Sequence, residues 1–427
     1  MSIPTRHFTR LPNGAMVLSE HAPQFQRIAL AATVLAGSVH EPPEKAGLAH
    51  VLEHVIFRGG PTLPTRKVQE EIQELGGAVN GRTHMDRTSY TATVLREDAG
   101  RALDLFAGIL RDPALSADDL ELEKSIVGDE DCRGCWGCTM QEAYYATAYP
   151  DQRLSLPTMG YEETVEALTA ADLAAFHEER YVGANMVVAI CGDLEHDAAV
   201  EMVAARFGDM EEGAASAAPD FTYAGGETHL ADRSDNSALW IGFDATHLSL
   251  PELWALDMFM DMLGGGGQSA LMQELREKRG LVYSAGAALD TVVRRESARI
   301  HLSGASQKIG EISAVALDLL GEMAARVDPD VLARTIRTDL AAQRMRLDSL
   351  EARVEDMATD MSDVGRVSDL AARFKGYRDL TPGAVEDAAR KMLATPPTLL
   401  LSGPLRGAPK FADLRARIGR ISAPVAA

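Results

Sequence analysis

Two halves of this 427-residue chain follow one plan, and the repetition limits the folds that the chain can adopt. In the first half, Leu168-Thr169 opens a helical pattern that leads into an apolar run ending at Gly192. In the second half, Leu380-Thr381 and Gly403 come 212 and 211 residues later and mark the same pattern. A near-constant offset indicates an internal duplication. We therefore predict an α+β fold with two homologous domains, each a sheet with helices packed on one face.

The boundary between the two domains is predicted from composition. Residues 210–226 shift to small and polar residues, which is typical of a linker. The N-terminal domain is expected over residues 1–209 and the C-terminal domain over residues 227–427.

The overall composition, with 46% hydrophobic and 25% charged residues, is that of an ordinary globular protein. No apolar run has the length of a membrane span, and the N-terminus lacks a run of the signal-peptide type, so we expect a cytoplasmic protein with no membrane partner. A net charge of −21 argues against a nucleic-acid partner, because no basic patch is available to neutralise phosphates.

Residues Gly47–Gly59 carry the strongest chemical signal. His50 and His54 are four residues apart in a helical pattern, so both imidazoles project from one face. This spacing suits two nitrogen ligands on one zinc ion, and Glu53 on the same face can act as a general base. The alternative is an ordinary amphipathic helix with two satisfied histidines.

A catalytic zinc ion takes a third protein ligand and keeps one position open. The acidic residues further along the first half include several candidates, and spacing alone does not choose among them: Glu121, Glu123, Asp129, Glu130 and Asp131.

The array around His50 closely resembles the inverted zinc motif of the pitrilysin, insulinase and mitochondrial processing peptidase family. Glu130 stands 76 residues after His54, where the family has its third ligand. The resemblance therefore implies a Zn²⁺ ion held by His50, His54 and Glu130, with Glu53 as the catalytic base. Glu123 lies seven residues before Glu130, and the resemblance assigns it the role of a supporting carboxylate.

Two further segments extend the resemblance. Residues 76–80 resemble the family's Gly-Gly-x-x-Asn segment at the edge of the active-site sheet, which implies that Asn80 contacts an extended substrate. Gly81 stands where the family commonly has alanine, and the alternating pattern from Ala78 to Leu95 predicts one strand.

In the second half, a glycine-rich loop over residues 263–271 precedes an Arg-to-Tyr stretch that also resembles the family. The resemblance implies that Arg276 and Tyr283, seven residues apart, bind the substrate. Tyr283 would stabilise an oxyanion and Arg276 would hold the substrate backbone. Arg279 is an alternative for the arginine. The helix predicted at Pro251–Leu263 has no histidine, so only the first half is expected to bind metal.

These features together predict a zinc-dependent endopeptidase that hydrolyses peptides or unfolded segments. By resemblance, the chain is one half of the clamshell that longer family members build in a single polypeptide. We expect a homodimer with two composite sites, or a heterodimer with a related metal-free subunit. Other hypotheses are a maturation peptidase for a presequence or a peptide-cofactor precursor, and a non-catalytic structural subunit.

The cysteines suggest a separate hypothesis. Cys132, Cys135 and Cys138 form a C-x-x-C-x-x-C run, and Cys191 lies in a predicted strand. We expect reduced thiols in the cytoplasm, with a second metal site or a redox sensor at the run as the alternative.

Overall fold

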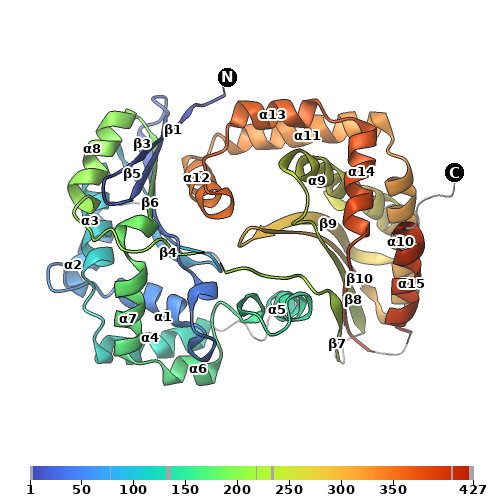
Figure 1. Ribbon diagram of the computed structural model, residues 1–427, viewed down its shortest axis with the longest axis horizontal. Helices are drawn as coiled ribbons and strands as arrows, with labels where there is room; N and C mark the ends of the chain where they lie inside the picture. Colours follow the sequence, from blue (N-terminus) through green and yellow to red (C-terminus); the bar gives the residue numbers. More distant parts are fainter. Residues whose placement is uncertain are drawn as a thin grey trace. The chain divides into compact units, whose positions relative to one another are not determined.

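The structure is a computed structural model that describes residues 3–76, 78–130, 136–217, 219–231, 235–404 and 407–422. The chain forms two compact units (Figure 1). Unit 1 comprises Met1–Gly134, Leu156–Asp220 and Arg344–Ala371, and unit 2 comprises Cys135–Ser155, Phe221–Gln343 and Ala372–Ala427. None of the helices in the described ranges has the length and apolar character needed to cross a membrane.

Unit 1 is built on a six-stranded sheet in the order β1-β2-β6-β3-β5-β4. The β2–β6 pair is parallel and the other neighbours are antiparallel. Gly14, at φ 87°, lies in the turn between the first two strands, as the Asn-Gly pair there favours. The strands are β1 (Arg6–Arg10), β2 (Met16–His21), β3 (Arg27–Val34), β4 (Val79–Thr83), β5 (Thr88–Leu95) and β6 (Met186–Gly192).

The single strand predicted from Ala78 to Leu95 is wrong. The chain turns back between β4 and β5, where the His84 backbone N–H donates to the Arg87 carbonyl at 2.8 Å. The intervening Met85 and Asp86 break the alternation of buried and exposed positions, which allows a hairpin. As a result, β4 is the last strand at its edge of the sheet.

Most helices of unit 1 cover one face of this sheet, so the predicted arrangement with helices on one face holds in part. Fully buried side chains such as Ile28, Leu52, Phe106 and Phe207 join strands and helices in one core. Each contributes about 1.5–3 kcal/mol through burial. The helices are α1 (Leu48–Ile56), α2 (Thr65–Glu74), α3 (Ala99–Arg111), α4 (Ala117–Glu130), α6 (Glu162–Ala167), α7 (Ala170–Arg180) and α8 (His196–Phe207).

One more helix, α12 (Leu350–Val364), lies on the opposite face of the same sheet, against β3 and β6 (Figure 1). Val354 and Met357 belong to the apolar cluster on this face. Arg353 donates to the fully buried Glu20 carboxylate at 2.7 Å, and Arg6 approaches the same carboxylate at 3.3 Å. Breaking a buried pair costs roughly 3–5 kcal/mol, so this contact fixes α12 on the sheet.

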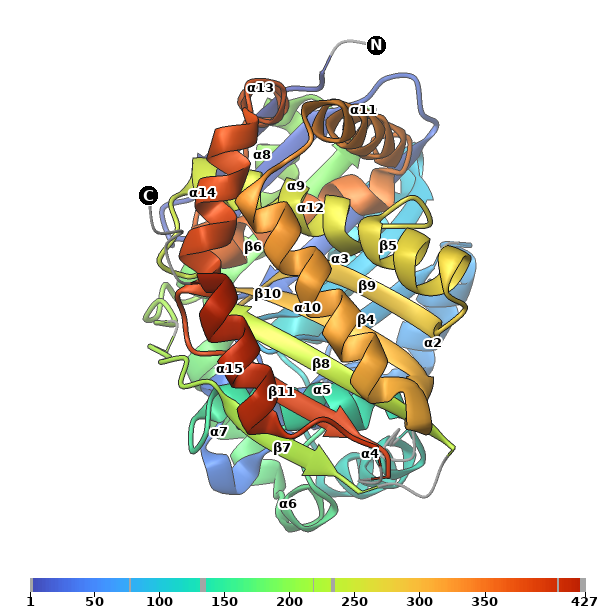
Figure 2. The same cartoon turned by 90° about the vertical axis from the view of Figure 1, so that its right-hand side faces the viewer.

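Unit 2 is built on a five-stranded sheet in the order β7-β11-β8-β10-β9, with β7 and β11 parallel. Helices α10, α14 and α15 lie across one face of it (Figure 2). The strands are β7 (Gly226–Leu230), β8 (Asn236–Asp244), β9 (Val282–Val292), β10 (Arg295–Ala305) and β11 (Thr398–Ser402). The helices are α5 (Trp136–Ala148), α9 (Leu250–Gly264), α10 (Ile309–Ala325), α11 (Pro329–Arg346), α13 (Leu370–Arg378), α14 (Pro382–Leu393) and α15 (Phe411–Ser422).

The two sheets repeat one topology, which confirms the predicted pair of homologous α+β domains. In chain order, β2, β3, β4, β5 and β6 occupy the same relative positions as β7, β8, β9, β10 and β11. The parallel pair is equivalent in the two sheets, and the neighbours on its other side are antiparallel in both.

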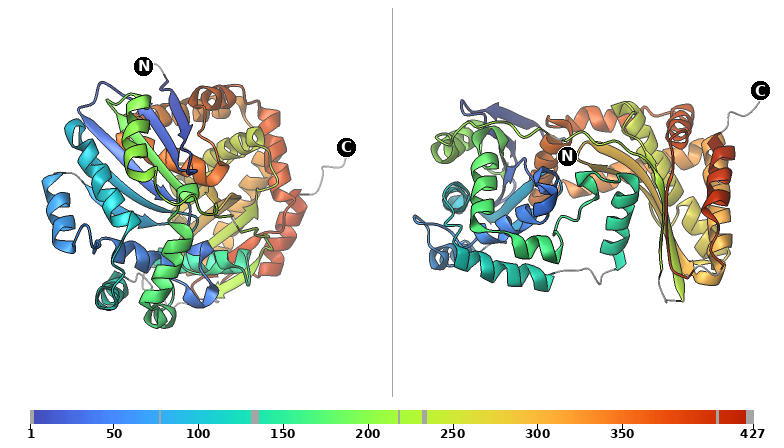
Figure 3. Two further views of the ribbon diagram at one scale, coloured as in Figure 1. Left: turned by 60° about the vertical axis from the view of Figure 1, so that its left-hand side comes forward. Right: turned by 60° about the horizontal axis from the view of Figure 1, so that its bottom comes forward.

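Each unit also contains one helix from the opposite half of the chain. Helix α5 packs on β7 and β11 in unit 2, on the sheet face away from α10 (Figure 3, right), and α12 packs on the sheet of unit 1. Residues 211–217 and 219–225, inside the predicted linker, form neither helix nor strand. Helix α5 precedes residues 210–226 in the chain but belongs to unit 2, and α12 follows them but belongs to unit 1. Dividing the chain at residues 210–226 therefore does not separate the compact units.

Candidate metal centre

Helix α1 is fixed at its start by a buried carboxylate. Glu41 accepts hydrogen bonds from the backbone N–H groups of Gly47 at 2.9 Å and Ala49 at 2.6 Å. Gly47 has φ 96°, a left-handed conformation that favours glycine. The apolar side chains of α1, Leu52 among them, are buried in the core of unit 1. His50 and His54 therefore share the less buried face of a helix whose register is set.

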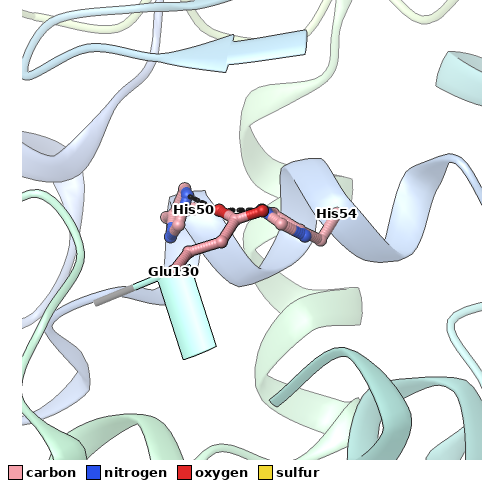
Figure 4. Close-up of side chains that lie close together, drawn as sticks. All are labelled: His50, His54 and Glu130. Atoms are coloured by element: carbon pink, nitrogen blue, oxygen red, sulfur yellow. Dashed lines mark ion pairs between the residues drawn. The ribbon is translucent and has the colours of Figure 1, made fainter. Parts of the chain in front are cut away.

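The structure brings both histidines to Glu130 at the end of α4 (Figure 4). The distance from Glu130 Oε2 to His54 Nε2 is 3.4 Å and to His50 Nε2 is 4.0 Å. One donor atom from each residue lies within 4.8 Å of the others, and no other such group of three occurs among the described residues. Of the acidic candidates that the structure describes, Glu130 is the one that joins this group, and Asp131 lies outside the described residues.

The His50 ring is in a state that can accept a metal ion. Burial, together with the neighbouring His54, lowers the pKa of His50 to about 4, so its ring is neutral at pH 7. The Nδ1 atom of His50 is buried and has no hydrogen-bond partner among the described residues. Two imidazoles with one carboxylate form a donor set that Zn²⁺ prefers, so these residues fit the ion.

Glu123 lies on the same helix as Glu130 and supports the other histidine. Its Oε2 is 3.2 Å from His54 Nδ1, and its Oε1 is bound by the Arg58 guanidinium. The Arg58 contact does not follow from the resemblance. The signal in the sequence is the position of Arg58, four residues or about one helical turn after His54, which puts it on the same side of the chain as that ring.

Glu53 faces the strand β4 rather than Glu123. The Thr83 hydroxyl donates to Glu53 Oε2 at 3.1 Å. Burial raises the pKa of Glu53, and the His54 ring and the Thr83 hydroxyl oppose that rise. A Cβ atom at Gly81 would lie 2.3 Å from Glu53 Oε1, so the absence of a side chain at Gly81 leaves room for the carboxylate.

A hollow of about 670 Å³ opens beside these groups. The metal-donor side chains and Glu53 form one wall, and β4 forms another through residues including Asn80 and Gly81. Because β4 is the last strand of its sheet, its outer edge carries backbone groups that a further strand can pair with. Asn80 is exposed there.

The Arg-to-Tyr stretch belongs to unit 2. Arg276 donates from Nη1 to the Tyr283 carbonyl at 3.3 Å, and the Tyr283 side chain is 83% exposed on the edge strand β9. Arg279 is held by Glu274 at 2.8 Å. Arg276, by contrast, contacts a backbone oxygen, and the assignment of Arg276 rather than Arg279 to substrate binding stays a prediction.

The cysteine run is only partly described. Cys132 and Cys135 lie outside the described residues, whereas Cys138 is on α5. Cys191 is buried in β6, and burial next to Glu20 raises the pKa of its thiol to about 12. This thiol is therefore protonated at neutral pH, and no cysteine joins a metal-donor group in the described part of the chain.

Comparison with known proteins identifies the family. The sequence pattern of insulinase (peptidase family M16) matches residues 16–162, and that of the peptidase M16 inactive domain matches residues 167–338. An uncharacterized zinc protease of Mycobacterium leprae is 31% identical over 328 residues, which cover 74% of this chain and 73% of that protein. This chain belongs to the M16 family of peptidases.

Other relatives extend the match along this M16 chain. An uncharacterized zinc protease of Streptomyces coelicolor is 26% identical over 420 residues, covering 93% of this chain and 89% of that protein. The crystal structure of a protease from Helicobacter pylori superposes with a TM-score of 0.85 at 20% identity, over 94% of this chain and 100% of that one. The latter likeness concerns the fold. The inactive-domain match includes α9, the helix without histidine.

Proposed function

We propose that this M16 peptidase is a zinc-dependent endopeptidase that hydrolyses peptides or unfolded segments. The observation that carries the proposal is the convergence of His50, His54 and Glu130, whose donor atoms lie within 4.8 Å of one another. The hollow beside them is within the size range of binding sites for small ligands.

The proposed chemistry assigns the proton transfers to Glu53. A zinc ion bound to the three donors would supply Lewis acidity, which makes water easier to deprotonate near neutral pH and polarises a peptide carbonyl. Thr83 occupies Glu53 Oε2, which leaves Oε1 to take a proton from the attacking water and to pass it to the departing amine. A raised pKa suits a group that must both accept and release that proton.

The proposed substrate mode is pairing of an extended peptide with the outer edge of β4. That edge borders the hollow, and Asn80 is exposed on it. Backbone pairing supplies binding that depends little on sequence, and side-chain pockets then select the residues around the cut. This mode suits peptides and unfolded segments, because their extended backbones are not already paired within a sheet.

We further propose a homodimer in which each chain lends Tyr283 and Arg276 to the metal centre of the other copy. The 83% exposure of Tyr283 and the contact of the Arg276 guanidinium with the Tyr283 carbonyl, which holds the two residues together, support this role. A heterodimer with a metal-free relative is the alternative. An active dimer of the purified chain in sedimentation would favour the homodimer, and activity only after addition of a second polypeptide would favour the heterodimer.

The test is metal analysis of the purified chain together with digestion of a peptide library and mass-spectrometric mapping of the cut sites. We expect one zinc ion per chain and hydrolysis that is lost on chelation and restored by zinc. A purified dimer with zinc at full occupancy that cuts no peptide would contradict the proposal.

A further inference from the structure

The two histidines of the metal centre are supported unequally. His54 has Glu123 Oε2 at 3.2 Å from its Nδ1 atom. His50 Nδ1 is buried and has no hydrogen-bond partner in the described part of the chain. The partner of the nitrogen that faces away from a metal selects the tautomer of an imidazole, and of the two histidines His54 is the one with such a partner among these residues.

Glu123 is oriented by an arginine. Its side chain is only 7% exposed, and a buried polar group is held in place by the partners that satisfy its hydrogen bonds. The Arg58 guanidinium contacts Glu123 Oε1 through both Nε and Nη2, which leaves Oε2 directed toward His54. The Arg58 backbone is itself anchored, because its carbonyl accepts from the Thr65 hydroxyl at 2.6 Å.

We propose that Arg58 is a positioning residue of the metal centre. It holds the Glu123 side chain with Oε2 on His54 Nδ1, so that His54 donates from Nδ1 to Glu123. His54 Nε2 then keeps its lone pair on the side of Glu130. The inference rests on the proposed zinc site and adds an order to it: His54 is the ligand oriented in advance, and His50 becomes oriented when the metal binds.

The test measures metal affinity rather than hydrolysis. Zn²⁺ or Co²⁺ is titrated into metal-free protein in competition with a chromophoric chelator. We expect Arg58→Met to weaken binding by roughly 10- to 100-fold, the usual effect of losing a partner of a ligand. Arg58→Lys should fall between Arg58→Met and wild type, because it keeps the charge but loses the two-nitrogen contact. Arg101→Met, which removes an arginine from Glu71 and Glu74 in the same unit, is the matched control and should bind as wild type.

A double-variant comparison separates positioning from a general structural role. If Arg58 acts through Glu123, then Arg58→Met added to Glu123→Ala weakens binding no further than Glu123→Ala alone. A second loss of similar size in that background, or wild-type affinity for Arg58→Met, would overturn the proposal.

A measurement on the metal-free wild type needs no variant to fold. In ¹⁵N spectra of its histidines, His54 should be in the Nδ1–H form, and finding it in the Nε2–H form would refute the role of Arg58. A chain that binds metal with these dependences but cuts no peptide would contradict the proposed function alone. A chain that binds no metal would overturn both proposals.

Discussion

Helices α1 and α9 occupy equivalent positions in the two units, but α1 carries polar side chains where α9 carries mostly apolar ones. Each follows the strand that lies between the parallel pair and the hairpin at the sheet edge, β3 in unit 1 and β8 in unit 2. On α1, Glu53 is buried, and His50 and His54 are partly buried, next to a hollow. On α9, the buried residues are mostly apolar, Phe259 and Met260 among them.

This difference shows that the fold does not need the polar group. In unit 2 an apolar helix packs at the same position. In unit 1, burying two imidazoles and a carboxylate there is unfavourable in free energy, because these groups lose contact with water. The cost is visible in the pKa values, because burial lowers that of His50 and raises that of Glu53. Residues that disfavour burial and are nonetheless kept together are best explained by function.

The largest expected effect comes from removing one donor. His50→Ala should lose stoichiometric zinc and all measurable hydrolysis, because two remaining ligands hold the ion poorly. Thermal unfolding of the metal-free protein should change little, since α9 shows that the position tolerates a helix without histidine. Metal analysis, peptide digestion and circular dichroism test these expectations. The control is His247→Ala, a part-exposed histidine just before α9, which should keep both metal and activity. Full zinc occupancy in His50→Ala would remove His50 from the ligand set.

The second effect separates metal binding from proton transfer. Glu53→Gln should keep its zinc and lose roughly 10²- to 10⁴-fold in kcat, which is the usual contribution of a general base. On α9, Asp261→Asn removes the charge of another part-buried carboxylate and should leave kcat unchanged. The two variants are compared by zinc content and by turnover of one peptide. Wild-type turnover by Glu53→Gln would rule out its assignment as the base.

A smaller effect is expected from the strand beside the metal centre. Gly81→Ala restores the residue common in the family, yet here the new Cβ atom would approach Glu53 Oε1 and the Phe57 ring, at 2.3 and 2.8 Å. The carboxylate has to shift, so we expect a fall in kcat of about tenfold with unchanged zinc content. The control is Gly128→Ala on α4, where nothing lies within 4 Å of an added Cβ atom and activity should persist. Unchanged kcat in Gly81→Ala would show that Glu53 adapts freely.

Sequence patterns predicted the features that follow from the spacing of residues along the chain. The four-residue interval between His50 and His54 determines a shared helix face, and the repeated offsets in the two halves predicted the duplicated fold, which the sheet topology confirms. Spacing alone left the third acidic partner open, because the distance between two helices depends on the tertiary fold. The resemblance to known peptidases chose Glu130, and the structure places it beside both rings.

Other features were not predictable because they arise from contacts between distant segments. The bond from Thr83 to Glu53 joins residues 30 positions apart on different elements. The exchange of α5 and α12 depends on which sheet face each helix buries, and the alternation of strand residues does not encode this choice. The β4–β5 hairpin was read as one strand because its turn, Met85-Asp86, lacks the glycine or proline that usually marks one.

The smallest expected effect tests whether the part-buried Asp261 in unit 2, unlike Glu53 in unit 1, has no role in the reaction. Burial, with the nearby Asp257 and Asp339, raises the pKa of Asp261 on α9 from 3.8 to about 7. Between these two values the folded protein keeps a proton that the unfolded chain has released, so the free energy of unfolding falls as the pH rises from about 4 to 7. Asp261→Asn mimics the protonated form and has no proton to release, so we expect its Tm to exceed that of wild type by a small margin at pH 5 and by a larger margin at pH 8. Calorimetry at the two pH values measures the difference in Tm. As a second readout, kcat of Asp261→Asn should equal that of wild type at both pH values.

Equal Tm values at pH 8 would mean that Asp261 is ionised in the folded protein without loss of stability. A loss of kcat would mean that α9, like α1, carries a group that the reaction needs.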